Sequence, residues 1–394
     1  MSFFACAPQP TKLHMPVKQR IYQIDLLRFI AALGIMLVHY LYRGFKADNL
    51  TNLSFLELAG DWVKYCAAFI DLFFIISGFV ITLSVSNKSV SYFFKSRVVR
   101  LFSVYWLCAF ITYMVIVFFG APRFTATFGQ FLFNLTLLQD FFDIERLDGA
   151  YWTMSVELRF YALALGYLIL YRYHKIKVTT IAYIWLALAI IFPFVQGNIL
   201  VRILDLFLMF EWAPAFIGGM LMAEIYKGKK ISIKNGVAIF ICFILSTFHR
   251  MIYAKMAMII YQETFSQVII VAVMFSVYAI MLTVILGRLK WLNKPYFLYL
   301  GIMTYPLYLL HQRIGYIIFN NLMGHFNKYI ILVGTITLMI TISYIIVKFV
   351  AGPLSNYLEK YLGLIIDYAI NSIRKPTTIK TEEIESIRSR LSDK

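Results

Sequence analysis

Charged residues are scarce in this sequence. Asp, Glu, Lys and Arg make up 14% of its 394 residues, whereas 61% are hydrophobic and 18% are aromatic. A water-soluble globular protein of this length needs far more charge on its surface, so that class is excluded. The composition is that of a polytopic membrane protein, for which the lipid bilayer is the solvent and membrane lipid is a constant partner.

Cysteine is also rare. Cys6, Cys66, Cys108 and Cys242 lack the close spacing of a metal-binding pair or of a disulfide framework. We interpret them as small packing residues and expect no metal site. The first twenty residues lack a short apolar core followed by a small-residue cleavage site, so we expect the first long apolar segment to direct membrane insertion.

Long apolar runs are abundant. A helix needs about 20 mostly apolar residues to cross a bilayer. We predict an all-α protein with about ten transmembrane helices, divided into a cytoplasmic segment (1–20), a transmembrane domain (21–352) and a cytoplasmic tail (353–394). The ten segments begin near Ile21, Trp62, Leu101, Tyr151, Val178, Leu204, Ile233, Phe265, Tyr296 and Ile330.

Acidic residues are outnumbered, with 20 Asp and Glu against 37 Lys and Arg, and the net charge is +17. Such an excess can indicate a nucleic-acid partner. Most of the basic residues, however, fall in every second segment between the apolar runs. This alternation is the positive-inside pattern, and it predicts that both termini are cytoplasmic. The charge therefore reports topology, and we expect no nucleic-acid partner.

The first apolar run, IDLLRFIAALGIMLVHY, contains three ionisable residues: Asp25, Arg28 and His39. Arg28 and His39 are eleven positions apart, which places both on one helix face about 16 Å apart along the axis. Ionisable groups at membrane depth are costly and usually line a cavity or pathway. Two structural alternatives stay open: Asp25 forms an ion pair with Arg28, and His39 is an interfacial histidine.

Glu157, in the fourth run, falls at a depth comparable with that of His39. A carboxylate beside an imidazole fixes its tautomer and raises its basicity, which is the arrangement of a general base. The alternative is that Glu157 pairs with Arg159 or Arg313 instead.

Two further runs carry ionisable groups near the middle of the membrane. Asp71 lies in AAFIDLFFIISGFVI and His311 in TYPLYLLHQRIGYII. At the cytoplasmic start of another run, FFKSRVVRLFSVYW places Arg97 and Arg100 three positions apart on one face. Paired guanidinium groups suit a phosphate-bearing ligand, although arginines there also satisfy the topology rule.

Taken in order, these segments resemble the membrane-bound acyltransferase 3 family. The most specific element is the arginine, ten residues and histidine of DLLRFIAALGIMLVH. The phrases FFIISGFVITLS, KSRVVRLFSVYW, WTMSVE and YPLYLLH are similar to the family as well. The resemblance extends from about Ile21 to Tyr361.

The resemblance implies an O-acyltransferase of the bacterial inner membrane that moves acetyl from cytoplasmic acetyl-CoA to a hydroxyl of a cell-surface glycan. His39 would be its essential histidine, acting as general base or transient acyl carrier, with Arg28 and Glu157 as catalytic partners. Arg97 and Arg100 would bind the acyl-CoA donor. Residues expected in the substrate site are Asp25, Asp71, Trp152 and His311.

Some family members carry a periplasmic esterase-like domain. We expect this chain either to acylate the glycan alone or to pass the acyl group to a separate periplasmic partner. A different class stays open: a proton-coupled transporter, or a glycan flippase or polymerase, would use the same intramembrane groups as a relay or sugar site. No internal repeat favours a transporter. Binding of acetyl-CoA would separate the two classes.

Overall fold

The computed structural model describes residues 20–374, except residues 60–61, 86–88 and 196. Residues 1–19 of the predicted N-terminal segment and residues 375–394 of the predicted tail therefore lie outside the described part. Within the described residues the chain is helical and contains no β-strand. The all-α prediction is confirmed.

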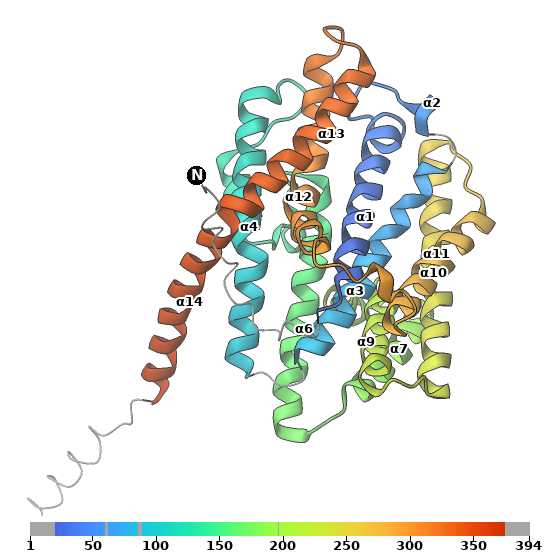
Figure 1. The fold of residues 1–394 in the computed structure, drawn as a ribbon, viewed down its shortest axis with the longest axis vertical. Coiled ribbons are helices and arrows are strands. Elements are labelled where there is room, and N and C mark those ends of the chain that lie inside the picture. Colours follow the sequence, from blue (N-terminus) through green and yellow to red (C-terminus); the bar gives the residue numbers. More distant parts are fainter. Residues whose placement is uncertain (1–19, 60–61, 86–88, 196, 375–394) are drawn as a thin grey trace, which may run out of the picture.

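The helices form one elongated bundle (Figure 1). Its central helices are α1 (Tyr22–Val38), α3 (Phe69–Val85), α4 (Val90–Phe119), α6 (Trp152–His174), α9 (Ala213–Gly228) and α12 (Phe297–Leu322). Around them lie α7 (Val178–Ile191), α8 (Ile199–Leu208), α10 (Ile233–Tyr261), α11 (Gln267–Ile285), α13 (Lys328–Ile345) and α14 (Ala351–Arg374). The short helices are α2 (Leu56–Ala59) and α5 (Phe128–Asn134).

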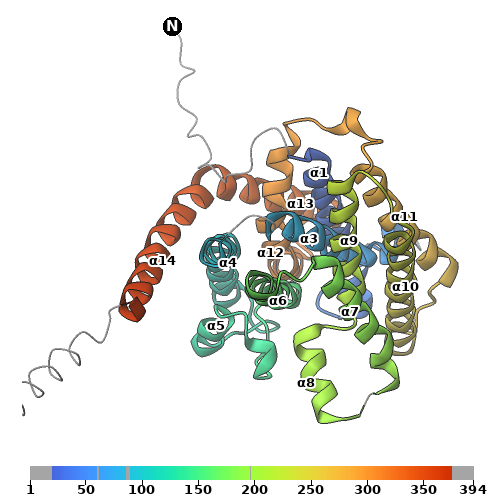
Figure 2. The same ribbon diagram turned by 90° about the horizontal axis from the view of Figure 1, so that it is seen from below.

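Helix α12 occupies the interior of the bundle. Seen from below, it lies among α1, α4, α6 and α13 (Figure 2). Its most extensive contact is with α1, whereas α3 packs most extensively on α9. The α3–α9 crossing depends on two glycines, because a Cβ atom at Gly78 would collide with the Phe216 carbonyl and one at Gly219 with the Ile75 carbonyl.

Among the described residues, seven helices are long and apolar enough to span a membrane, or eight if α8 and α9 form one span bent by 44°. The seven correspond to predicted segments and establish a multi-pass membrane protein. They cover Tyr22–Lys46, Val63–Val85, Val90–Phe119, Gly149–His174, Ile233–Ile259, Gln267–Ile285 and Lys328–Ile366.

The other three predicted spans differ from simple transmembrane helices. The segment from Val178 ends at Phe194 and is short. The segment near Leu204 is interrupted at Met209, whose backbone is left-handed (φ 50°). Helix α12 has 26 residues but is not one of the apolar spans, because it carries polar residues such as Gln312 and Asn320. Its interior position lets protein groups satisfy that polarity.

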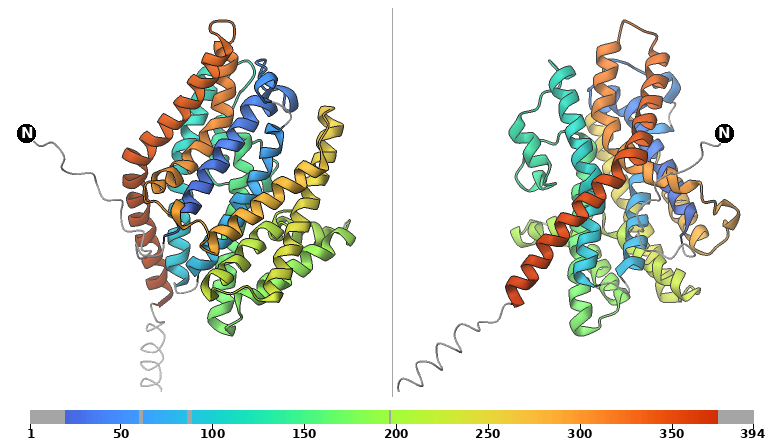
Figure 3. Two further views of the ribbon diagram at one scale, coloured as in Figure 1. Left: turned by 45° about the vertical axis from the view of Figure 1, so that its right-hand side comes forward. Right: turned by 60° about the vertical axis from the view of Figure 1, so that its left-hand side comes forward.

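The C-terminal helices are continuous. Helix α13 passes through a π-helical turn (Ile346–Val350) into α14, so the predicted boundary at residue 352 falls inside a helical segment. Helix α14 leans across α4 on the outside of the bundle (Figure 3). A hydrogen bond of 3.1 Å from Ser355 Oγ to Ser103 Oγ and an ion pair of 3.8 Å between Lys95 and Glu359 join the two helices.

Candidate active site

Two histidines meet inside the bundle. His39 is the first residue of a π-helical segment (His39–Ala47) that continues α1, and π-helical turns are frequent at functional sites. His311 lies in the middle of α12 and is fully buried, whereas His39 is 6% exposed. His39 Nδ1 and His311 Nε2 are 2.7 Å apart, a hydrogen bond between residues 272 positions apart in the sequence.

The partners of His311 determine which nitrogens carry protons. His311 Nδ1 is 2.8 Å from the Tyr308 carbonyl oxygen. A carbonyl only accepts, so Nδ1 holds the proton of His311 and its Nε2 is an acceptor in the neutral ring. His39 must then donate from Nδ1, which leaves a lone pair on His39 Nε2. The Tyr308 carbonyl thus sets the tautomer of His311, and His311 in turn sets the tautomer of His39.

Two tyrosines hold the histidine-bearing segments together. Tyr40 donates a hydrogen bond of 2.7 Å to the His311 carbonyl, and Tyr316 donates one of 3.2 Å to the His39 carbonyl. Both tyrosines are fully buried. These reciprocal bonds cross-link α12 to the end of α1, so the two imidazole rings are supported by backbone on both sides.

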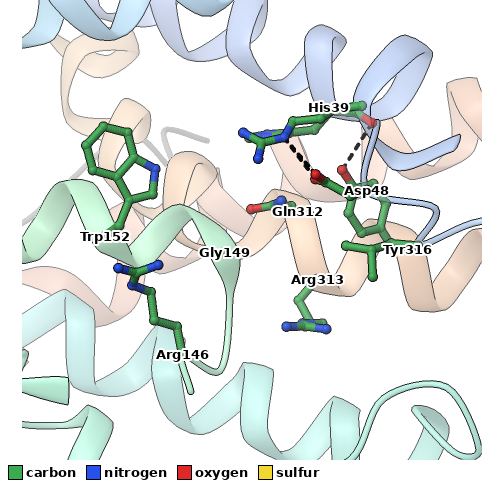
Figure 4. A pocket seen from close by; sticks show the side chains of 10 residues that line it. His39, Asp48, Arg146, Gly149, Trp152, Gln312, Arg313 and Tyr316 are labelled. Atoms are coloured by element: carbon green, nitrogen blue, oxygen red, sulfur yellow. Dashed lines mark hydrogen bonds and ion pairs between the residues drawn. The ribbon is translucent and has the colours of Figure 1, made fainter. Parts of the chain in front are cut away.

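A pocket of about 260 Å³ adjoins His39. It lies between the π-helical segment, the loop before α6, the start of α6 and α12 (Figure 4). The side chains around it are mostly polar or aromatic, which is typical of a site that orients a polar substrate. The pocket is lined by His39, Arg43, Asp48, Leu50, Arg146, Gly149, Trp152, Gln312, Arg313 and Tyr316.

A second group of charged residues lies between α1 and α4, nearer the N-terminal end of α1 than His39. We use the name arginine cluster for Arg28 on α1 together with Arg97 and Arg100 on α4, because Arg28 and Arg97 both lie within electrostatic range of Arg100. Arg97 is buried, and its Nε has no hydrogen-bond partner in the described chain. Its guanidinium carbon lies 5.7 Å from the centre of the Tyr161 ring. Arg97 and Arg100, which the sequence predicted as a pair, therefore lie near Arg28.

Glu157 belongs to the arginine cluster and not to the histidine pair. It accepts a 2.5 Å hydrogen bond from Tyr161, and its charge acts on Arg28 and Arg97. The predicted pairing of Glu157 with His39 is wrong. The start of α6 lies at the pocket, but Glu157 lies farther along the helix, beside Tyr161. The histidine that α12 contributes takes the predicted place of the carboxylate.

Asp25 lies at the start of α1 and is buried. Arg20 donates to it from Nε (3.0 Å) and Nη2 (3.2 Å), whereas the Arg28 guanidinium is 4.0 Å away. The expected pair with Arg28 is thus the longer contact. Asp25 does not line the pocket among the described residues, so the structure gives no support to its expected place in the substrate site.

Asp71 forms a buried ion pair with Arg250, which joins α3 to α10. Its Oδ2 is 2.5 Å from Arg250 Nε on α10, and the Arg250 guanidinium lies 4.8 Å from the centre of the Trp212 ring. Asp71 is not among the described residues that line the pocket. The structure therefore does not support the expected place of Asp71 in the substrate site. It shows Asp71 in a contact between α3 and α10.

Breaking the buried Asp71–Arg250 pair should destabilise the protein. Asp71→Ala leaves an unpaired buried cation, and such losses cost about 3–5 kcal/mol. We expect a clearly lower melting temperature for the detergent-solubilised protein. Glu224→Ala, which breaks the half-exposed pair with Lys227, is the control and should cost about 1 kcal/mol or less. Equal effects of the two variants would contradict the structural assignment of Asp71.

Several lining residues were absent from the sequence prediction. Arg43, Arg146, Gln312 and Tyr316 line the pocket but are not among the site residues that the sequence predicts. The available signal was the polar LHQR stretch around His311, which is unusual inside an apolar run. Trp152, which was predicted, does line the pocket.

The comparisons with known proteins decide the family. A family model described as an acyltransferase domain, that of acyltransferase 3, matches residues 21–348. The chain belongs to this family. The acyltransferase 3 match contains both histidines and the whole arginine cluster.

A curated relative of this acyltransferase 3 protein is Nodulation protein 10 of Rhizobium leguminosarum bv. viciae. The two are 28% identical over 160 residues, which cover 35% of this chain and 41% of the relative. The alignment thus spans less than half of the relative's length. No solved structure gives a significant match.

Proposed function

We propose that this protein is a membrane O-acyltransferase that transfers acetyl from cytoplasmic acetyl-CoA to a hydroxyl of a glycan on the other side of the membrane. The family supports the class of reaction. The observation that carries the proposal is the unprotonated Nε2 of His39, a buried base on a pocket lined by polar groups. Both termini are taken to be cytoplasmic, which puts the arginine cluster on the donor side of a bacterial inner membrane.

The arginine cluster fits the phosphates of an acyl-CoA. Glu157 is a carboxylate close to the three guanidinium groups, whereas Asp25 is hydrogen-bonded chiefly to Arg20. The cluster therefore has more positive than negative charge. The unsatisfied Nε of buried Arg97 is a further donor for a phosphate oxygen. Arg28 and His39 are about 16 Å apart along α1, a distance comparable with the length of an extended pantetheine arm.

The proposed chemistry at His39 is proton transfer. Nε2 takes the proton of the glycan hydroxyl while the oxygen attacks the thioester carbonyl; a C–O bond forms and the C–S bond breaks. The imidazolium returns the proton to the departing thiolate of CoA, so atoms and charges balance. During this step, His39 keeps donating from Nδ1 to His311. The same lone pair would serve if His39 carried the acyl group transiently, and label retained on protein without acceptor would identify that route.

Binding of acetyl-CoA tests the proposal against a transporter or flippase. An acyltransferase should be stabilised by its donor, because a ligand that binds only the native state raises its melting temperature. We expect acetyl-CoA to raise the melting temperature of the detergent-solubilised protein. The absence of any shift at millimolar acetyl-CoA would favour the transporter class, which has no reason to bind it.

Arg97→Ala combined with Arg100→Ala should raise the KM for acetyl-CoA. Charge-assisted hydrogen bonds contribute about 1.5–3 kcal/mol each, which corresponds to roughly 10- to 100-fold. We expect kcat to change much less, because the cluster is remote from His39. Arg172→Ala, an exposed residue at the corresponding end of α6, is the control. An unchanged KM in the double variant would remove the cluster from the donor site.

A further inference from the structure

The pocket beside His39 carries recognition groups that proton transfer does not use. They comprise an aromatic ring, an amide oxygen without a partner and two guanidinium groups with unused N–H donors. We infer that the pocket binds an acidic sugar, one that carries a single carboxylate near the hydroxyl to be acylated. This inference rests on the proposed function for the role of His39, and it adds the chemical class of the acceptor.

Gln312 supplies an acceptor for a sugar hydroxyl. The residue is 5% exposed, it lines the pocket, and its Oε1 has no hydrogen-bond partner in the described chain. Gly149 makes room for this amide, since a Cβ atom there would lie 2.8 Å from Oε1 and 3.0 Å from Nε2. A buried acceptor without a donor is costly, and a ligand hydroxyl would remove that cost.

Arg146 and Arg313 supply donors for an anion. Arg146 uses Nε to bind Asp140 at 2.7 Å, and Arg313 uses Nε to bind the Leu147 carbonyl at 3.0 Å. The terminal Nη groups of both have no acceptor among the described residues. Such fork-shaped donors match the two oxygens of a carboxylate.

The neighbouring carboxylates limit the charge that the pocket can accept. Asp48 is bound to Arg43 at 2.9 Å, and Asp140 offsets Arg146. Burial raises the pKa of Asp148 to about 6, although the backbone N–H groups of Ala150 and Arg313 donate to it. The three arginines around the pocket are thus matched by three carboxylates, so the pocket suits a singly charged carboxylate better than a doubly charged phosphate.

Trp152 supplies a surface for the sugar ring. It lines the pocket, is half-buried, and is supported from behind by Trp212, whose ring centre is 4.9 Å away. Figure 4 shows Arg146 on the Trp152 side of the pocket, with Gln312 between that side and His39. A sugar resting on Trp152 would thus have its carboxylate near Arg146 and a hydroxyl directed towards His39.

Isothermal titration of the purified, detergent-solubilised protein tests this inference without relying on catalysis. The probe is a short oligosaccharide of alternating hexuronic acid and N-acetylhexosamine, and its matched control is the same oligosaccharide with each carboxyl reduced to a primary alcohol. We expect the acidic form to bind at least about tenfold more tightly. Equal affinities, or no binding of either form, would overturn the inference.

Variants locate the carboxylate. Arg146→Gln and Arg313→Gln should each reduce the preference for the acidic form about tenfold, and the corresponding lysine variants should lie between these and the wild type. Gln312→Leu should weaken both forms alike. Arg202→Gln, on an exposed face of α8 outside the pocket, should change nothing. Unchanged preference in correctly folded Arg146 and Arg313 variants would overturn the assignment.

Different results would contradict the proposed function and the acidic-sugar site. A wild-type protein that prefers the acidic sugar but transfers no acetyl group would contradict the acyltransferase proposal and support the acidic-sugar site. Transfer to neutral and acidic sugars with equal kcat/KM would support the acyltransferase and contradict the site.

Discussion

Replacing His39 by alanine is expected to lower the rate of acetyl transfer by about 10²- to 10⁴-fold, the usual contribution of a general base. The loss should appear in kcat, because the donor site at the arginine cluster is about 16 Å away along α1. Binding of acetyl-CoA, measured by thermal shift, should persist. Steady-state kinetics with labelled acetyl-CoA provides the measurement.

His39→Ala also leaves the acceptor His311 Nε2 without its partner, so some loss of stability is expected. His39→Asn addresses this, because the asparagine amide can donate to His311 but cannot act as a base. Both variants should show this loss of activity, whereas His174→Ala, at the exposed end of α6, should behave as the wild type. A His39→Asn protein with near wild-type kcat would show that His39 is not the base.

Replacing His311 by leucine is expected to lower kcat by about 10²-fold with little change in either KM. His311 touches the ring of His39 and acts through it, so it is a positioning residue. Without His311, nothing fixes the proton of His39 on Nδ1. Removing the partner that sets the tautomer of a functional histidine lowers activity by about 10-fold to 10⁴-fold.

His311→Gln separates positioning from substrate binding. Its amide oxygen can accept from His39 Nδ1, so this variant should recover part of the lost kcat. The sequence prediction of a substrate-binding His311 would instead raise the KM for the acceptor in both variants. A rise in KM without a change in kcat would therefore contradict the positioning role.

The sequence identified the helices that carry the polar groups, but it did not give the depth and the neighbours of every one of them. Counting helical rise placed His39 and His311 at similar depth, because rise per residue is nearly constant. It could not give the rotation of α12 or α6 about their axes. Glu157 was assigned to the depth of His39, although it lies farther along α6, where it accepts from Tyr161 and belongs to the arginine cluster.

The spans illustrate the same limit. Seven apolar runs became long helices, since hydropathy and length suffice to identify a lipid-facing helix. The break between α8 and α9 was not predicted. Asp205 accepts a hydrogen bond from the Phe210 N–H across it. Nor does the pattern of apolar residues predict the π-helical segment that begins at His39. Local backbone departures of this kind depend on tertiary contacts.

Acetyl transfer across a sealed membrane tests the central claim most directly. Proteoliposomes that hold the protein in a known orientation would receive labelled acetyl-CoA on the side of the arginine cluster and an acidic oligosaccharide on the side of the pocket. We predict alkali-labile label on the oligosaccharide with the wild-type protein and at least about 100-fold slower labelling with His39→Asn. Equal labelling by both proteins, or no labelling by the wild type despite bound acetyl-CoA, would contradict the proposed mechanism.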